Sequence, residues 1–229
     1  GLAADLWSKH WAFTRLPSNP DPSIGGLVAI KGLVAFQRSL NPGALFGLGK
    51  GLTPLFIAAS LLALGFVVFL FYHSTRQRRS LHLALGLVLA GALGNLYDRA
   101  YMIADVVKFT DNGRSATVVG KIVKPGETPI RIGVWPEGNF ARPIAPESNP
   151  QVRQLGVVRD FVKIQPQFKL RGHTVDLWPW VFNVADVLLV FGVSILMLNF
   201  WWERRQEKAA TGKADSAQTS PGSSLNTPA

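Results

Sequence analysis

Two pairs of polar residues stand in segments that otherwise carry almost no charge. Asn95 and Asp98 lie at the end of one apolar run, and Asn183 and Asp186 interrupt another. Both pairs have a spacing of three residues, so that on a helix the amide and the carboxylate would share one face. An ionisable group within or beside a membrane span costs at least a few kcal/mol, which makes it a functional candidate by default. We therefore consider these carboxylates first as groups for acid–base chemistry.

A structural interpretation of the same residues remains open. Polar side chains inside membranes also form hydrogen bonds between helices, each worth roughly 0.6 to 2 kcal/mol. For Asn95 and Asn183 this role and a direct role in chemistry are equally supported. Asp186 would lie about nine residues into its apolar run, below the membrane surface, where a purely structural carboxylate is harder to explain.

Other catalytic and binding chemistries find little support in the sequence. The chain has no Cys, which excludes a thiolate nucleophile, a disulfide and a Cys-ligated metal. No Ser stands out beside a suitable Lys or His base, and no cofactor is expected. Residues 47–51 superficially resemble a phosphate-binding loop but lack a strand and a helix around them. We expect no metal site, because no two ligands have the spacing of one helix turn among His10, His73, His82 and His173.

Three long apolar runs predict membrane-spanning helices. Residues 53–72 carry no charge, and a helix of that length crosses about 30 Å of hydrocarbon. We predict further spanning helices at residues 81–104 and 178–202, each flanked by aromatic rings that favour the headgroup level. The second predicted helix carries small residues at every fourth position, which indicates a face for close helix packing: Gly86, Ala90 and Gly94.

The net charge of +10 is placed asymmetrically along the chain. Basic clusters follow the first and the last predicted span, and by the positive-inside rule both lie in the cytoplasm, as does the C-terminus. The regions before residue 53 and between residues 99 and 177 then lie outside. A nucleic-acid surface is not expected, because no stripe of basic and aromatic residues accompanies the charge. The two clusters are Arg76, Arg78 and Arg79, and Arg204, Arg205 and Lys208.

The segments outside the three runs differ in composition. We expect residues 1–13 to form the outer end of a first helix that is largely missing from this chain. Residues 14–52 are rich in Pro and Gly and predict turns and short strands that lie on the membrane. Residues 105–177 contain alternating apolar stretches that predict a β-rich insertion at the outer face. Two cytoplasmic segments complete the chain, a basic loop at residues 73–80 and a disordered tail at residues 203–229.

Five sequence boxes, in order along the chain, resemble those of signal peptidase II, the prolipoprotein signal peptidase. They are DLWSK at residues 5–9, NPGALFG at residues 41–47, GALGNLYDR at residues 91–99, GVVRDFV at residues 156–162, and WP at residues 178–179 with FNVAD at residues 182–186. The resemblance is specific because it covers most of the chain. One departure is the stretch between Arg99 and Gly156, which is far longer than is usual in that family.

The resemblance implies roles for particular residues. The catalytic pair would be Asp160 and Asp186, the carboxylates of the fourth and fifth boxes. Asp98 is a rival for the role of Asp160, but the resemblance makes it a supporting residue together with Arg99. Other residues that would line the site or hold the substrate are Asp5, Lys9, Asn41, Asn95 and Asn183.

The resemblance also implies a fold, a location and a substrate. The fold would be mainly α, a four-helix transmembrane bundle with a β-rich cradle at its outer face and the extra insertion between the last two helices. The protein would cross the bacterial cytoplasmic (inner) membrane several times, with its active site at the periplasmic face. Its partners would be membrane lipids and a prolipoprotein signal peptide with a lipid-modified cysteine, and we expect a monomer.

The predicted chemistry is that of an aspartic endopeptidase. Two carboxylates that face each other cannot both ionise cheaply, so they share a proton near neutral pH. The ionised member can take a proton from water while the protonated member polarises the scissile carbonyl, without a metal or a covalent intermediate. Two alternatives stay open, a proton-coupled transporter and a non-catalytic membrane scaffold, although we find no internal repeat and few spans.

Overall fold

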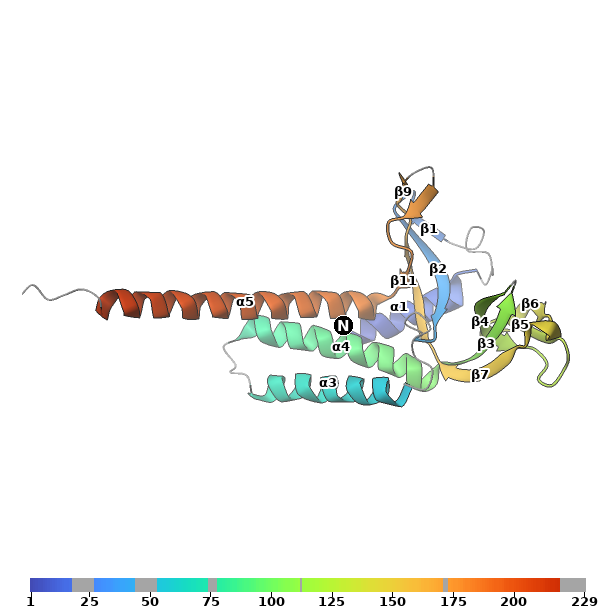
Figure 1. Ribbon diagram of the computed structural model, residues 1–229, viewed down its shortest axis with the longest axis horizontal. Helices are drawn as coiled ribbons and strands as arrows, with labels where there is room; N and C mark the ends of the chain where they lie inside the picture. The colour runs from blue at the N-terminus through green and yellow to red at the C-terminus, as the bar shows by residue number, and fades with distance from the viewer. Residues whose placement is uncertain (18–26, 44–52, 74–77, 112, 171–172, 219–229) are drawn as a thin grey trace, which may run out of the picture.

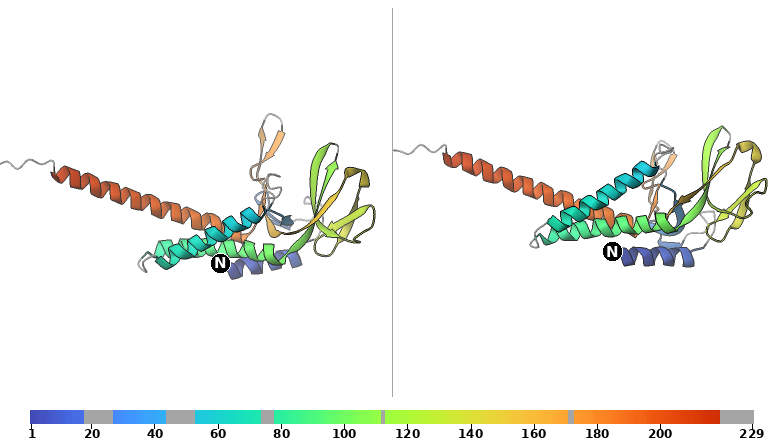
Figure 2. Two further views of the ribbon diagram at one scale, coloured as in Figure 1. Left: turned by 60° about the horizontal axis from the view of Figure 1, so that its bottom comes forward. Right: turned by 90° about the horizontal axis from the view of Figure 1, so that it is seen from below.

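Helices and sheets occupy opposite ends of the structure. The computed structural model describes residues 1–17, 27–43, 53–73, 78–111, 113–170 and 173–218. The helices of these residues pack along one another, the strands gather beyond one end of them, and α5 extends past the others at the far end (Figure 1 and Figure 2). The helices are α1 (Leu2–Arg15), α3 (Thr53–His73), α4 (Arg79–Tyr101) and α5 (Val184–Gln218).

Apolar composition explains why the long helices form. By length and composition alone, α4 and the Val184–Gln206 part of α5 could cross a membrane. Large apolar side chains are exposed along the helices, among them Phe66 and Phe69 on α3 and Val190 and Phe191 on α5. A continuous apolar surface of this kind is unfavourable in water and is satisfied by lipid. The helices therefore fit a membrane protein.

A four-stranded antiparallel sheet, which we call the cradle sheet, packs against α1. Its order is β1-β2-β8-β11, so β8 lies between β2 and the short strand that leads into α5. Ala12, Phe13, Leu16 and Phe161 form the buried core between this sheet and α1. The strands are β1 (Leu27–Ile30), β2 (Val34–Asn41), β8 (Val158–Ile164) and β11 (Val181–Phe182), and a hairpin of β9 (Gln167–Leu170) and β10 (His173–Asp176) follows β8.

A second antiparallel sheet, the insertion sheet, lies in the chain between α4 and β8. Its order is β6-β5-β4-β3-β7. The strands that come first and last in the chain, β3 and β7, pair with each other, and Ile103 lies opposite Gly156. The chain therefore leaves and re-enters the rest of the fold at adjacent positions. The strands are β3 (Ile103–Asp111), β4 (Arg114–Ile122), β5 (Ile130–Val134), β6 (Asn139–Ile144) and β7 (Gln151–Gly156), with a short 3-10 helix at Pro146–Ser148.

Two predicted spans lose residues to strands where they meet the sheets. The helix predicted at residues 81–104 ends at Tyr101, because the residues that follow join β3 and pair with β7. The helix predicted at residues 178–202 begins only at Val184. Pro179 has no backbone N–H to donate within a helix, and the strand that follows it pairs with β8.

The last helix continues further than the sequence analysis predicts. Residues 203–229 are predicted to be disordered, yet α5 continues to Gln218. The added segment is rich in Glu, Arg, Lys, Ala and Gln, which are good helix formers and extend a helix that has already started. The prediction of disorder is therefore wrong for residues 203–218, and residues 219–229 lie outside the described part of the chain.

Glycines allow α4 and α5 to approach closely. A Cβ atom added at Gly91 would collide with the backbone oxygen of Ala185, and one added at Gly192 would collide with the backbone of α4. Close backbone approach through small residues is a common way of packing membrane helices. Gly86, a member of the predicted packing face, instead has nothing within 4 Å of such an added atom.

Gly91→Leu should destabilise the fold, whereas Gly86→Leu should not. The new side chain at position 91 would collide with α5, and overpacking of this kind costs about 1 to 3 kcal/mol. At position 86 the same side chain would extend into open space. Thermal unfolding in detergent should give a midpoint several degrees lower for Gly91→Leu than for Gly86→Leu, and equal midpoints would contradict the close packing at Gly91.

Candidate active site

Asp160 and Asp186 lie where the cradle sheet meets α5. Asp160 stands on β8, paired across the sheet with Ser39 of β2, and Asp186 stands in the first turn of α5. The side-chain amide of Asn183 donates to Oδ1 of Asp160 at 2.6 Å. The side-chain amide of Asn95 donates to Oδ1 of Asp186 at 2.9 Å. Each candidate carboxylate thus accepts a hydrogen bond from an asparagine side chain.

The two asparagines also contact each other, which joins the carboxylates into one network. Nδ2 of Asn183 donates to Oδ1 of Asn95 at 3.2 Å. Asn183 has no exposed surface, and Asp160 is 2% exposed. Because buried polar groups need partners within the protein, these hydrogen bonds fix both side chains. The structure brings together four of the predicted site residues at this point.

The spacing of three residues between Asn183 and Asp186 has a structural cause that the sequence analysis did not identify. Asn183 precedes the helix and caps it, because its Oδ1 accepts the backbone N–H of Asp186 at 3.1 Å. Oδ2 of Asp186 in turn accepts the backbone N–H of Asn183 at 3.2 Å. This reciprocal capping box satisfies two N–H groups at the start of the helix. It also restricts the Asp186 side chain to one orientation.

A carboxylate from α1 completes the start of α5. Oδ1 of Asp5 accepts the backbone N–H of Ala185 at 2.8 Å, and its Oδ2 lies 2.8 Å from Nζ of Lys9. A Cβ atom at Gly94 would collide with the Asp5 carboxylate, so only glycine lets α4 pass at this point. The N-terminal end of a helix carries partial positive charge, which favours carboxylates near it.

Lys9 is the central cation of the site. Its Nζ lies 2.8 Å from Asp5 and 3.3 Å from Asp98, and it donates to Oδ1 of Asn95 at 3.0 Å. Lys9, Asp5 and Asp98 have no exposed surface. A buried ammonium is tolerated only when it is paired and hydrogen-bonded. Lys9 meets both conditions, and in doing so it links α1 to α4.

Asp98 binds Arg159, a residue that the sequence analysis did not single out. Nε and Nη2 of Arg159 donate to Oδ1 of Asp98 at 3.1 and 2.7 Å, and the backbone N–H of Arg159 donates to Oδ2 at 2.9 Å. Lys9 also lies against Oδ2, so both oxygens are occupied. The available signal was an arginine within the apolar stretch at residues 157–162, where a buried guanidinium requires a partner.

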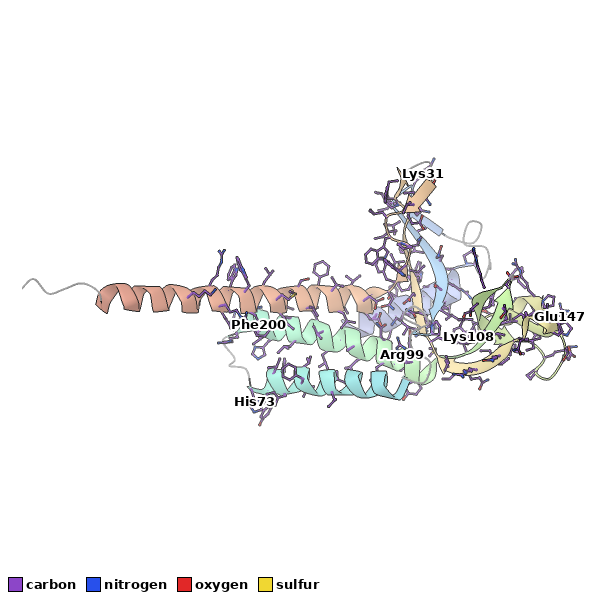
Figure 3. All side chains as sticks on the ribbon, viewed as in Figure 1. Lys31, His73, Arg99, Lys108, Glu147 and Phe200 are labelled. Atoms are coloured by element: carbon purple, nitrogen blue, oxygen red, sulfur yellow. The ribbon has the colours of Figure 1, made fainter. Side chains whose placement is uncertain are left out.

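Asn41 and Arg99 lie at the edge of this network. Asn41 forms a side-chain hydrogen bond with Asp160, and its Oδ1 accepts the backbone N–H of Gly43 at 2.9 Å. Gly43 has a φ of +74°, a conformation that favours glycine, and a Cβ atom there would collide with the Arg99 guanidinium. Arg99 is exposed at the end of α4 nearest the sheets (Figure 3). All of the predicted site residues thus gather at one end of the helices.

The pKa of Asp160 is raised to about 7. Burial is the main cause because it disfavours the charged form, and the neighbouring Asp186 carboxylate adds to the rise. Hydrogen bonds from Asn183 and Asn41 and the charge of Lys9 act in the opposite direction. Asp160 can therefore carry a proton near neutral pH, as one member of an acid–base pair of carboxylates must.

The chemistry of the site is that of two carboxylates bridged by amides. Within the described ranges, no three His, Cys, Asp or Glu side chains group in a way that could hold a metal ion. A protonated and an ionised carboxyl group side by side can give and take protons in one reaction. Activation of a water molecule is the reaction that this arrangement supports best.

Comparison with known families identifies the chain. The family described as Signal peptidase (SPase) II matches residues 1–202. The chain belongs to the signal peptidase II family. The protein is therefore a protease, and the match extends from α1 into the membrane-length part of α5.

The chain is also similar to curated proteins named lipoprotein signal peptidase. The relative from Desulfitobacterium hafniense is 28% identical over 169 residues, which is 74% of this chain and 70% of the relative. The relative from Rhodopirellula baltica is 30% identical over 202 residues, or 86% of this chain and 66% of the relative. The relative from Leptospira biflexa is 29% identical over 213 residues, or 91% and 88%.

Two solved structures of a bacterial membrane enzyme share the fold. One is 18% identical, with a TM-score of 0.52, and covers 89% of this chain and 84% of its own. The other is 17% identical, with a TM-score of 0.53, and covers 87% and 86%. At this identity the likeness concerns the fold alone. The predicted membrane fold of apolar helices combined with β-sheet is confirmed at that level.

Lys9→Met should destabilise the protein strongly. The change leaves the Asp5 and Asp98 carboxylates without their shared cation, and breaking a buried pair costs about 3 to 5 kcal/mol. Lys124→Met is the matched control, because Lys124 pairs with Glu127 in an exposed turn, where an ion pair is worth about 0 to 1 kcal/mol. Thermal unfolding in detergent measures the difference. A Lys9→Met protein as stable as Lys124→Met would contradict the central role of this ammonium.

Proposed function

We propose that this protein cleaves diacylglyceryl-modified prolipoproteins just before the lipid-modified cysteine, with Asp160 and Asp186 as its catalytic pair. The name shared by the relatives, lipoprotein signal peptidase, supports the substrate class. The choice of Asp160 and Asp186 as the catalytic residues rests on the hydrogen bonds through which asparagines join them and on their different surroundings. Asp160 has a pKa of about 7, while Asp186 lies at the positive end of a helix dipole. These environments suit one carboxyl group to act as acid and the other as base.

Peptide-bond cleavage then follows as acid–base catalysis on water. The ionised Asp186 takes a proton from water, whose oxygen attacks the scissile carbonyl carbon, while the protonated Asp160 gives its proton to the carbonyl oxygen. The tetrahedral gem-diol collapses as the C–N bond breaks, the proton on Asp186 passes to the leaving nitrogen, and a hydroxyl proton returns to Asp160. No covalent bond to the enzyme forms. These roles describe the protonation state that we propose for the resting enzyme.

Asp98 is less suited than Asp160 to the catalytic role. Its oxygens already accept from the Arg159 side chain, the Arg159 backbone and Lys9. Few acceptor positions remain for a water molecule, and none of these partners is a substrate group. The contacts support a positioning role, in which Asp98 holds β8 against α4 and so places the neighbouring Asp160.

We also propose that α1, α3, α4 and α5 form a four-helix bundle across the bacterial inner membrane, with the active site at the periplasmic face and the C-terminus in the cytoplasm. Basic residues at the end away from the site support this orientation, because Arg78 pairs with Glu203 there and Arg205 stacks on Trp201 at 4.0 Å. Aromatic rings at both ends fit the two headgroup regions. The exposed rings at the site end include Trp178, Trp180 and Tyr101.

The proposed substrate fits an active site at a membrane surface. The acyl chains of the modified cysteine remain in lipid while the apolar signal peptide lies along the helices. A monomer suffices for this reaction, because the proposed pair and every side chain that holds it come from one chain.

Asp160→Asn and Asp186→Asn should each reduce cleavage of a diacylglyceryl-modified prolipoprotein by about 100-fold or more, as expected for the loss of acid–base catalysis. The Asp160→Asn midpoint should stay close to that of the wild type, because its remaining carbonyl oxygen can still accept from Asn183. The Asp186→Asn midpoint should be modestly lower, because both Asp186 oxygens accept N–H groups and the amide replaces one acceptor with a donor. Asp98→Asn should also lower the midpoint, because it removes the negative charge that faces Arg159 and Lys9. Full cleavage by a folded Asp160→Asn protein would move the catalytic role to Asp98, and no cleavage by the wild type would favour a scaffold.

Cleavage should decline as the pH rises above about 7, because Asp160 then loses the proton that it donates.

The raised pKa of Asp160 also makes the stability of the fold depend on pH. Between the ordinary pKa of 3.8 and about 7 the folded protein holds a proton that the unfolded chain has released, so stability falls as the pH rises through this window. Asp160→Asn removes this loss, and its unfolding midpoint should fall less between about pH 4 and about pH 7, the two ends of this window, than that of the wild type. An identical pH dependence in the two proteins would contradict the buried titration of Asp160.

A further inference from the structure

The insertion sheet and the cradle sheet enclose a cleft of about 690 Å³ that the proposed chemistry does not use. One wall consists of the end of α1 and the strand β2, and the other consists of β3 to β6. The volume lies within the range of about 300 to 1,000 Å³ that is typical of ligand sites. Apolar and polar groups both line it, including Val118 and Phe140 from the insertion sheet and Gln37 from β2.

The cleft begins beside the strand that carries Asp160. Ser39 and Leu40 line the cleft, and across the cradle sheet they pair with Asp160 and Arg159. The next residue of β2, Asn41, hydrogen-bonds the Asp160 side chain. A polypeptide whose scissile bond lies at Asp160 therefore has this cleft next to it.

The direction in which the substrate chain runs past Asp160 decides which part of it reaches the cleft. A signal peptide precedes the cut, and its apolar segment lies along the membrane-spanning helices. The insertion sheet stands beyond the end of those helices, on the side away from the C-terminal part of α5 (Figure 1 and Figure 2). Residues that follow the cut therefore leave at the end of the helices where the two sheets and the cleft between them lie (Figure 1 and Figure 2).

The two walls of the cleft are already fastened together. The ring of Trp135, from the insertion sheet, packs edge-on against Phe13 of α1 with centroids 6.1 Å apart. Within the insertion sheet, its Nε1 donates to the carbonyl oxygen of Ile103 at 2.8 Å, which holds the ring in place. Arg38 of β2 lies 3.4 Å from Glu137 of the insertion sheet. A preformed cleft binds an extended chain without first having to assemble its walls.

We infer that this cleft binds the first residues of the mature lipoprotein, the extended polypeptide that follows the lipid-modified cysteine. The inference rests on the proposed function, because it concerns the product side of the same substrate. Strand β6 is the edge of its sheet and lines the cleft, so it offers backbone groups to an extended chain. Contacts of the mature segment should therefore lower KM rather than raise kcat.

Two substrates that differ only after the modified cysteine test this assignment. The short one ends about three residues beyond the cysteine, and the long one continues for about fifteen residues, roughly 50 Å when extended. Wild-type enzyme should cleave the long substrate with a KM roughly tenfold lower, which corresponds to about 1.4 kcal/mol of binding. Val118→Trp should fill the cleft and remove this preference, with kcat for both substrates and KM for the short one unchanged.

Val152→Trp is the matched control. Val152 on β7 is 42% exposed, close to the 38% of Val118, but it does not line the cleft. This variant should keep the preference for the long substrate. A second variant, Phe140→Asn, removes a ring from the cleft at a position with a φ of +55°, which Asn adopts readily, and it should also raise KM for the long substrate alone.

The outcomes separate the inference from the function on which it rests. Equal KM values of the wild type for the two substrates would overturn the cleft assignment while the enzyme remains a signal peptidase. A long-substrate preference that survives Val118→Trp and Phe140→Asn, or that is lost equally in Val152→Trp, would overturn it as well. Failure of the wild type to cleave either substrate would overturn the proposed function itself.

Discussion

The buried ammonium of Lys9 is the constraint on which the placement of the site depends. A charge without water must have partners, and Lys9 takes one carboxylate from its own helix and one from α4. Arg159 then neutralises the second carboxylate, so two cations and two anions form a balanced cluster. The cost of removing these charges from water offsets much of the attraction between them. The main effect of the cluster is therefore to fix how α1, α4 and β8 are arranged, and its contribution to stability is smaller. The cluster can form only where these three elements meet.

The proposed catalytic carboxylates are placed through members of this cluster. Arg159 and Asp160 are consecutive on β8, and the alternation of side chains along a strand points them to opposite faces. Arg159 faces Asp98 on α4, so Asp160 faces Asn183 at the start of α5. Asp5 binds the first turn of that helix through Ala185, which sets the position of Asp186. One set of ion pairs thereby determines where both carboxylates lie.

Much of the helical part of the fold could be predicted because its physical signal is strong. An uncharged run such as residues 53–72 has few stable alternatives to a spanning helix, and α3 covers the same residues to within one position. The start of α5 could not be predicted as well, because Trp178 and Val181 suit a membrane span and a strand equally. The pairing of β11 with β8 decides between them, and that contact lies outside the local sequence.

The candidate site shows the same division between local and distant information. Asn183 and Asp186 could be selected from the sequence because polar residues interrupt an apolar run. Their spacing of three residues, however, is explained by the helix cap that they form as well as by a shared helix face. Arg159 escaped selection because its partner, Asp98, is sixty-one residues away and the intervening insertion hides their proximity. Strand pairing of β3 with β7 restores that proximity.

The insertion is joined to the site by backbone contacts rather than by flexible linkers. The N–H of Val157 donates to the carbonyl oxygen of Met102 at 2.9 Å, one residue beyond the last pair of the β3–β7 ladder. A Cβ atom at Gly156 would collide with the backbone of Arg99, so the end of β7 packs directly on the end of α4. The insertion sheet can therefore move little without moving the end of α4, where Asp98 holds β8. A segment bound between the two sheets would lie in a fixed relation to Asp160, because the same backbone contacts position the cleft and the carboxylate.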